Sequence, residues 1–248
     1  MKLTGHRVLV TGGTSGIGLA LARALLQRGN RVAVCGRRQA ALDRATASAP
    51  GLLAFPFDLA DEATLARLPG EVESRLGGLS LLVNNAGVQH LCDFTRDPTE
   101  ELLRRIDEEI AVNLAGLARV TAVLLPLLRR APGAALLNVS SGLGLVPKRS
   151  APVYCATKAG VHLFTRALRW QLQDAGAGVE VFELLPPLVD TPMTEGRGKG
   201  KLSPEEVAEA ALRGMAAGRE EIRVGKVRLL AALNRLAPRL AERALRNA

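Results

Sequence analysis

The sequence predicts an α/β fold in which helices cover both faces of a doubly wound parallel sheet. Six short apolar runs predict strands: RVLV, RVAVC, LLAFPF, LSLLVN, AALLNVS and GVEVFELL. Helix-like segments separate these runs, and such alternation is typical of parallel sheets. The runs are apolar almost throughout, as expected for strands that are buried on both sides. No repeat or linker divides the chain, so we expect a single domain over residues 1–248.

The elements follow one another in a clear order. The first strand leads into the glycine-rich segment TGGTSGIG, Thr11 to Gly18, and then into a helical pattern. Residues 99–130 predict one or two long helices, and residues 151–174 predict another. Three glycines make 194–202 the best candidate for a mobile loop. The last residues, about 225–248, form a basic tail with leucines at roughly helical spacing.

The succession of strand, glycine-rich turn and helix favours a phosphate-binding loop near the N-terminus. Gly12 permits the tight turn, Gly16 lets the backbone approach a pyrophosphate, and Gly18 lets the helix pack closely on the sheet. The free amides at the helix start would face the phosphates, and the helix dipole favours negative charge there. A loop with a purely structural role is the alternative. The same ligand is expected to contact the residues between these glycines, namely Thr14, Ser15 and Ile17.

Tyr154 and Lys158 stand four residues apart in the stretch PVYCATKAGVHLF. On a helix, positions i and i+4 share a face, so the phenol comes within reach of the ammonium. The cation favours the phenolate, and we therefore expect it to lower the Tyr154 pKa from about 10. Such a tyrosine can exchange a proton with a substrate oxygen near neutral pH. The same spacing also occurs by chance on solvated helix faces, so the other motifs decide its meaning.

Together these segments resemble the short-chain dehydrogenase/reductase family, and the resemblance covers nearly the whole chain. TGGTSGIG is similar to the family's cofactor loop, and NNAG (Asn84 to Gly87) is similar to the motif after its fourth strand. Asn113 in VNLAG resembles its helix asparagine, and Ser141 lies thirteen residues before Tyr154, as the family's catalytic serine does. PPLVDT resembles its Pro-Gly-x-Val-x-Thr segment, with Pro187 in place of the glycine.

More narrowly, CGRR, NNAGVQ, PVYCATKA and the double proline resemble the subgroup that contains the oxidoreductase encoded beside bacterial teichoic-acid D-alanylation genes. The resemblance implies a Rossmann-type sheet of about seven strands. It also implies an NAD(P)(H)-dependent oxidoreductase that transfers a hydride between nicotinamide and a carbonyl or alcohol substrate. A non-catalytic NADP(H)-binding regulatory protein of the same fold is the alternative. Such relatives usually lack the tyrosine or the lysine, whereas both are present here.

The resemblance assigns roles to four catalytic residues. Tyr154 would give a proton to the carbonyl oxygen during reduction, or take it during oxidation. Lys158 would lower the Tyr154 pKa and hold the ribose hydroxyls. Ser141 would hydrogen-bond the substrate oxygen as charge develops there, and Asn113 would hold a water that links Lys158 to bulk solvent. The three histidines show no metal-ligand spacing, so we expect no metal.

The segment CGRR favours NADP(H), with NAD(H) as the alternative. An acidic residue at the end of the second strand would bind the ribose 2′-hydroxyl and reject a phosphate. Gly36 stands there instead, followed by Arg37 and Arg38, and arginine can pair with a 2′-phosphate. A solvated helix start is the other interpretation of the two arginines.

The resemblance also implies further cofactor contacts. Asp58 would lie near the adenine, Asn85 and Gly87 would shape the wall beside it, and Thr191 and the Val189 backbone would meet the nicotinamide amide. The remaining expected contacts are Leu59, Ala86, Pro186, Tyr154 and Lys158.

The net charge of +9 is concentrated in the tail. From Arg223 to Ala248, seven basic residues accompany one acidic residue, whereas the preceding 222 residues carry a net charge of only +3. No aromatic residues interleave with these arginines, so we expect no nucleic-acid partner. We expect the tail, which Pro238 would kink or split, to pack on the domain or on a neighbouring subunit. Contact with an anionic membrane through a basic amphipathic helix is the less favoured alternative.

Three scattered cysteines and the lack of a secretory pattern favour a cytoplasmic protein. No uninterrupted apolar run reaches the roughly 18 residues of a membrane-spanning helix. We expect a small-molecule carbonyl or alcohol substrate and a homodimer or homotetramer. The sequence identifies neither the substrate nor the direction of the reaction.

Overall fold

In the computed structural model, which describes residues 1–246, seven parallel strands form one sheet in the order β3-β2-β1-β4-β5-β6-β7. The order reverses between β1 and β4, as in a doubly wound Rossmann sheet, and ligands bind such sheets at this point. The predicted fold class is confirmed. The strands are β1 (Arg7–Thr11), β2 (Arg31–Gly36), β3 (Leu53–Pro56), β4 (Leu81–Asn84), β5 (Ala134–Val139), β6 (Val179–Leu185) and β7 (Glu221–Arg223).

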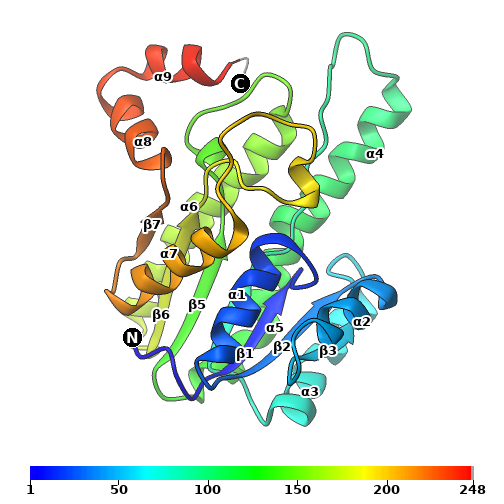
Figure 1. The fold of residues 1–248 in the computed structure, drawn as a ribbon, viewed down its shortest axis with the longest axis vertical. Helices are drawn as coiled ribbons and strands as arrows, with labels where there is room; N and C mark the ends of the chain where they lie inside the picture. Colours follow the sequence, from blue (N-terminus) through cyan, green and yellow to red (C-terminus); the bar gives the residue numbers. More distant parts are fainter. Residues whose placement is uncertain (247–248) are drawn as a thin grey trace.

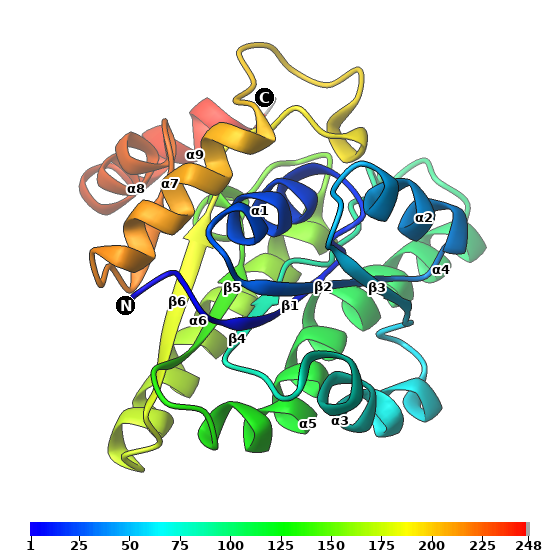
Figure 2. The same cartoon turned by 60° about the horizontal axis from the view of Figure 1, so that its bottom comes forward.

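Helices cover both faces of this sheet. One face carries α1, α2 and α7, and the other carries α3, α5 and α6 (Figure 1, Figure 2). The helices are α1 (Gly16–Gln27), α2 (Gln39–Ala47), α3 (Glu62–Leu76), α4 (Thr99–Ile110), α5 (Leu117–Arg129), α6 (Pro152–Asp174), α7 (Pro204–Ala216), α8 (Val227–Leu236) and α9 (Pro238–Leu245). The chain also contains the π-helix η1 (Ala111–Gly116) and two 3₁₀ turns, η2 (Gly142–Gly144) and η3 (Pro192–Thr194).

The two faces bury two separate aliphatic cores. Successive side chains of a strand point to opposite faces, so Val8 enters the core beneath α1 and α7, whereas Leu9 enters the core beneath α3 and α5. Both side chains are fully buried. This explains why the strand runs are apolar at every position rather than at alternate ones.

The segment from α4 through η1 to α5 is one continuous helix, Thr99–Arg129. By length and mean hydropathy alone this helix could cross a membrane. It contains no uninterrupted apolar run of that length, because Arg119 lies within its apolar part. Here its apolar side packs in the second core, where Leu117, Val120 and Leu124 are buried. The helix is therefore a core element of this fold.

The basic tail forms two helices, α8 and α9, which separate at Pro238 as predicted. Val227 and Ala241 are buried against the rest of the chain, whereas Leu229 and Leu236 are 74% and 83% exposed. The tail thus packs on its own domain through part of its apolar side only. In Figure 1 it stands at the same end of the molecule as the loop that precedes α7.

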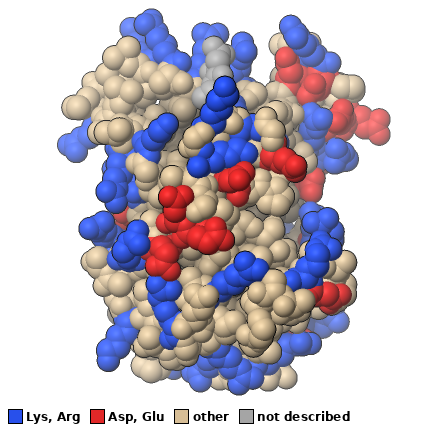
Figure 3. Space-filling view, in the orientation of Figure 1, with Lys and Arg blue, Asp and Glu red and all other residues tan. Residues whose placement is uncertain are grey.

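The positive charge does not gather into one continuous surface on the face drawn in Figure 3. Blue side chains are scattered over the whole view, and acidic side chains form a group near its centre.

Candidate active site

A cavity of about 570 Å³ is lined by residues that follow β1, β2, β3, β4, β5 and β6 at the carboxyl edge of the sheet. It brings together most of the residues that the sequence singles out. These are Gly12, Thr14, Ser15, Gly16, Ile17, Arg37, Arg38, Asp58, Leu59, Asn85, Ala86, Gly87, Tyr154, Lys158, Pro186 and Thr191. Four predicted residues, Gly18, Asn113, Ser141 and Val189, are buried and do not line it.

The glycine loop passes close to its neighbours. Gly12 has a φ of +63°, and a Cβ there would lie 2.8 Å from the Cα of Ala86. A Cβ on Gly18 would lie 2.3 Å from Asn85 Nδ2 and 2.5 Å from the Gly12 carbonyl oxygen. Both contacts are shorter than any side chain can accept, so only glycine fits these positions without rearrangement. The expected tight turn at Gly12 and close packing at Gly18 agree with this geometry.

Asn85 fastens the loop to the end of β4. Its side-chain amide donates to the carbonyl oxygens of Thr11 and Gly12 at 3.0 and 3.1 Å. In return, Thr11 Oγ1 accepts from the backbone N–H groups of Asn85 and Ala86 at 3.0 and 3.1 Å. The NNAG motif therefore holds the loop in shape, a positional role that its sequence alone does not reveal.

The start of α1 opens onto this cavity without a side-chain cap. Ser15 is the N-cap residue, its side chain makes no capping bond, and the first turn holds no acidic residue. The first backbone N–H groups of a helix lack intrahelical partners, and the helix dipole adds positive potential there. This end of the cavity therefore favours an anion such as a phosphate.

Tyr154 and Lys158 share the face of α6 that lies against the cavity, as the four-residue spacing predicts. Tyr154 is 9% exposed and Lys158 is 3% exposed. The Lys158 ammonium donates to the carbonyl oxygen of Val139 at 2.8 Å and lies 5.8 Å from the centre of the Tyr154 ring. Ser141, at the end of β5, hydrogen-bonds Tyr154 and accepts from the N–H of Leu143 at 3.1 Å.

The expected lowering of the Tyr154 pKa by Lys158 is wrong for this structure. Burial raises the pKa of Tyr154 to about 12, and the Ser141 hydrogen bond and the Arg197 charge oppose that rise only in part. The Lys158 ammonium donates to a backbone carbonyl and does not offset the effect of burial on this pKa. Burial lowers the pKa of Lys158 itself to about 8, and the Glu183 carboxylate acts in the opposite direction.

Asn113 lies inside the π-helix η1 and is fully buried. Its amide group binds both backbone groups of Val88, accepting from the N–H at 2.8 Å and donating to the C=O at 2.9 Å. A Cβ on Gly87 would lie 3.2 Å from Asn113 Oδ1 and 3.6 Å from Lys158 Nζ, so these groups converge. The side chain fixes the NNAG segment beside Lys158, and its expected water-holding role stays a prediction.

Arg37 and Arg38 differ in their surroundings. Arg37 lies 3.5 Å from a carboxylate oxygen of Glu108 on α4. Arg38 precedes α2, is exposed, and forms no ion pair within residues 1–246. A Cβ on Gly36 would lie 3.1 Å from Thr14, which leaves little space there for a larger side chain. Arg38 is therefore the better placed of the two to meet an additional anion.

The loop between β6 and α7 covers one side of the site. Its ends are joined where Val189 pairs with Leu202 in a single β-bridge. Arg197 reaches from this loop to Gln89, whose side-chain oxygen accepts its hydrogen bond at 2.8 Å. The predicted loop at 194–202 is thus present, and it follows the residues Thr191 to Met193 that line the cavity. Its mobility stays a prediction.

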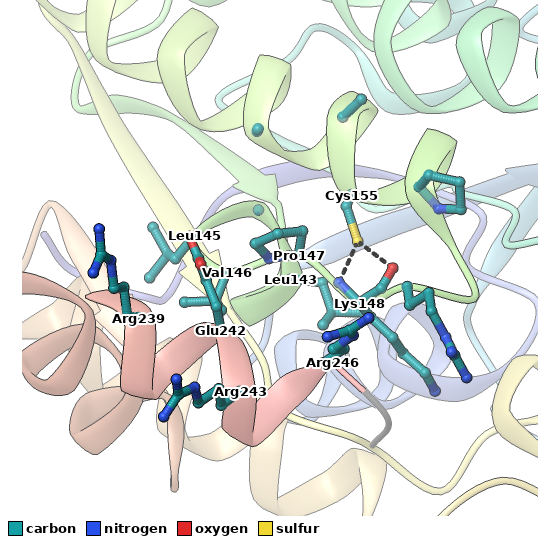
Figure 4. Close-up of a pocket in the computed structure, with 15 residues that line it drawn as sticks. Leu143, Leu145, Val146, Pro147, Lys148, Cys155, Arg239, Glu242, Arg243 and Arg246 are labelled. Carbon is teal, nitrogen blue, oxygen red and sulfur yellow. Dashed lines mark hydrogen bonds between the residues drawn. The ribbon is translucent and has the colours of Figure 1, made fainter. Parts of the chain in front are cut away.

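A second cavity, of about 780 Å³, lies between the 143–149 segment, the start of α6 and α9 (Figure 4). It is larger than the first but contains none of the predicted catalytic residues. Cys155, the neighbour of Tyr154, points into it and accepts from the N–H of Lys148 at 3.3 Å. Four arginines line it, Arg149, Arg239, Arg243 and Arg246, so the tail forms one wall of a basic hollow beside the site.

Sequence reasoning missed a buried carboxylate and a partly buried histidine near Lys158. Glu183 on β6 is completely buried, and His162 follows Lys158 by one helical turn. The detectable signal was the second glutamate of VEVFELL, which stands in the apolar run VFELL, because a buried acid requires partners.

Comparison with known proteins adds independent evidence. A family model described as short chain dehydrogenase matches residues 6–202. The uncharacterized oxidoreductase DltE of Bacillus subtilis (strain 168) is 41% identical over 229 residues, which cover 90% of this chain and 89% of that protein.

Solved structures agree in fold. A short chain dehydrogenase from Burkholderia cenocepacia J2315, in complex with NADP, superposes with a TM-score of 0.86 at 27% identity and covers 99% of both chains. A short chain dehydrogenase/reductase from Burkholderia phymatum, in complex with NAD, superposes with a TM-score of 0.85 at 24% identity. The superposition covers 100% of this chain and 97% of that one. With its motifs, its sheet order and these matches in agreement, the chain belongs to the short-chain dehydrogenase family.

Proposed function

We propose that this protein transfers a hydride between NADP(H) and the carbonyl or alcohol carbon of a small molecule. The observation that carries the proposal is that the glycine loop, Tyr154 and Lys158 line one cavity. The dinucleotide supplies the hydride when bound, and the protein supplies position, charge and a proton.

The residues present fit a dinucleotide. The uncapped start of α1 offers backbone amides to the pyrophosphate, and no acidic side chain in its first turn opposes an anion. The close approaches at Gly12 and Gly18 keep side chains out of this part of the cavity. Lys158 and Tyr154 lie farther along the same cavity, where they would hold the ribose and face the reacting carbon.

The protonation states favour reduction of a carbonyl. With its pKa raised by burial, Tyr154 keeps its proton at neutral pH and can donate it to a carbonyl oxygen. Ser141 accepts from the Leu143 N–H, and its own O–H, which acts on the Tyr154 phenol, would hydrogen-bond the same substrate oxygen. The Lys158 ammonium supplies positive charge beside the phenol as the proton leaves.

NADP(H) is preferred in this proposal because of the end of β2. Gly36 provides no carboxylate to repel a 2′-phosphate, and Arg38 borders the cavity with no acidic partner in the part of the chain that the structure describes. Arg37 borders it too, but it shares its charge with Glu108.

Two measurements test the proposal. The fluorescence of purified protein titrated with NADPH and with NADH gives the preference, and about tenfold tighter NADH binding would contradict the role of Arg38. An NADPH-consumption screen over aldehydes, ketones and quinones gives the activity. Tyr154→Phe should abolish turnover and leave cofactor affinity nearly unchanged. Tight NADPH binding without turnover across the panel would favour the regulatory alternative.

We further propose that the substrate carries an anionic group. Arg197 comes from the covering loop, is held by Gln89, and its charge acts on the Tyr154 phenol. Arg197→Gln should raise KM for keto acids more than for neutral ketones, because its charge acts on Tyr154, whereas Arg96→Gln, which changes an arginine whose side chain is 84% exposed, should change neither. An equal rise for both substrate classes would contradict this assignment.

We also propose self-association through α4 and α6. These helices contact each other and leave large apolar side chains exposed, namely Leu103 and Ile110 on α4 and Leu163 and Trp170 on α6. Trp170→Glu should lower the oligomeric mass measured by light scattering, whereas Leu229→Glu on the tail should not. A wild-type monomer would contradict the proposal.

A further inference from the structure

A carboxylate lies buried in the middle of the sheet, close to the proposed active site. Glu183 on β6 is 0% exposed. In the register of the sheet it lies between Asn138 on β5 and Glu221 on β7, and Asn138 in turn pairs with Asn84 on β4. A polar row thus crosses four adjacent strands. A buried charge persists only where its surroundings compensate for the lost hydration.

Two side chains hold the Glu183 carboxylate. Ser140 Oγ donates to Oε1, and His162 Nδ1 lies 3.1 Å from Oε1 and 2.9 Å from Oε2. Ser140 immediately precedes the proposed catalytic Ser141. His162 follows Lys158 by four residues, so Tyr154, Lys158 and His162 stand at i, i+4 and i+8 along α6. The helix therefore lays these three groups along one face, over β5 and β6.

Lys158 needs a counter-charge, and Glu183 is the acid that supplies one. The ammonium is 97% buried, and its hydrogen bond goes to the neutral carbonyl of Val139, the residue before Ser140. No acidic side chain lies within ion-pairing distance of it among residues 1–246. Burial favours the neutral amine, and Glu183 acts against that tendency.

The other charges around the pair lie nearer to the surface. Glu221 on β7 faces His162 and forms an ion pair with Arg223, and Arg166 lies one turn after His162 on α6. Arg169 on α6 is directed instead at the carbonyl of Val181 and at Glu220. The ligand-type atoms of His162, Glu183 and Glu221 lie within 4.8 Å of one another, but each carboxylate already has a protein partner. This arrangement suits a charge network rather than a metal site.

We propose that Glu183, oriented by Ser140 and His162, is the counter-charge that keeps Lys158 protonated and thereby sets the alkaline limit of catalysis. Glu183 touches neither the cavity nor the reacting groups, so it is a positioning residue that acts through Lys158. The inference rests on the proposed function for its kinetic consequence, but the charge state of Lys158 does not depend on turnover. As pH rises, the amine loses its proton, the support for the developing phenolate disappears, and the rate of reduction falls.

The direct test follows the lysine itself. The chain has six lysines, so nuclear magnetic resonance of nitrogen-labelled lysine can resolve each amine, and Lys158→Arg identifies the Lys158 signal. Glu183→Gln keeps the shape and removes the charge. It should lower the Lys158 pKa, because the Glu183 charge opposes the effect of burial on this amine. The exposed neighbour on the same strand supplies the control, Glu180→Gln, which should leave the Lys158 pKa unchanged.

The kinetic test adds a readout that a merely structural role would not produce. In Glu183→Gln the pH at which kcat for carbonyl reduction falls on the alkaline side should decrease by as many units as the Lys158 pKa. The value of kcat on the acidic plateau and KM should stay close to wild type. His162→Asn removes the cation that competes for Glu183, so the Lys158 pKa should stay the same or rise. A folded Glu183→Gln protein with an unchanged Lys158 pKa would overturn the inference. A lowered Lys158 pKa in both Glu183→Gln and His162→Asn would overturn it too.

The outcomes separate the two proposals. If Glu183→Gln does not fold, Ser140→Ala weakens the same carboxylate's support and should lower the Lys158 pKa in the same direction by a smaller amount. If no carbonyl is reduced, the proposed function fails, and the lysine titration still decides the role of Glu183.

Discussion

Tyr154 is the only tyrosine in the chain, so near-ultraviolet absorbance can follow its ionisation without interference from another phenol. Burial raises its pKa to about 12 in the cofactor-free protein. Relative to an ordinary tyrosine with a pKa of about 10, this shift corresponds to about 3 kcal/mol in favour of the neutral phenol. The sign follows from the chemistry: the raised pKa keeps the proton on the oxygen below pH about 12.

The assay compares folded and unfolded protein at one pH. At pH about 10.5, an ordinary tyrosine is about three-quarters ionised, whereas Tyr154 should be about 3% ionised. Protein in concentrated urea gives the ordinary value, Tyr154→Phe gives the baseline, and circular dichroism verifies that the fold persists. A folded sample with more than half of its phenol ionised would refute the reasoning and would restore the expectation that Lys158 acidifies this tyrosine.

Three further perturbations follow from contacts in the same region. Gly18→Ala should weaken NADPH binding about tenfold or more and lower Tm, because its Cβ would lie 2.3 Å from a side-chain nitrogen and 2.5 Å from a backbone oxygen. Its control is Gly70→Ala, because a Cβ at Gly70 meets nothing within 4 Å. This substitution should raise the free energy of unfolding in urea by about 0.5–1 kcal/mol. Arg38→Ala should raise the Kd for NADPH about tenfold without changing that for NADH, and Arg37→Ala should have a smaller effect; equal losses for both cofactors would contradict the phosphate role. Val227→Ala should cost about 1–3 kcal/mol of unfolding free energy and lower kcat/KM, because this buried side chain packs on the turn after the proposed serine; unchanged kinetics would separate the tail from the site.

Much of the fold could be predicted from the sequence because its first six strands are apolar almost throughout and its helices are long. The six apolar runs correspond to β1 through β6. The strand β7, Glu221–Arg223, was missed because three residues with charges at both ends carry no readable pattern. Pro238 divides the tail as its missing N–H requires.

The site could be predicted as a set of residues but not as an electrostatic arrangement. Spacing placed Tyr154 and Lys158 on one helical face, and the structure agrees. Whether the ammonium acts on the phenol depends on how deeply each is buried and on the Val139 carbonyl, which sequence distance does not encode. The partnership of Ser140, His162 and Glu183 joins residues from two strands and a helix, so only the folded chain reveals it.

The position of β1 has a consequence for how the chain is made. It is the first strand to leave the ribosome, yet it lies third in the sheet, between β2 and β4. On the side of β1 that faces β4, Val8 pairs with Leu81. This edge of β1 therefore stays unpaired while β2, β3 and three helices are synthesised. Such delayed, non-local pairing slows folding and leaves backbone groups open to foreign strands. We therefore expect newly made chains to aggregate most readily when translation is interrupted before β4.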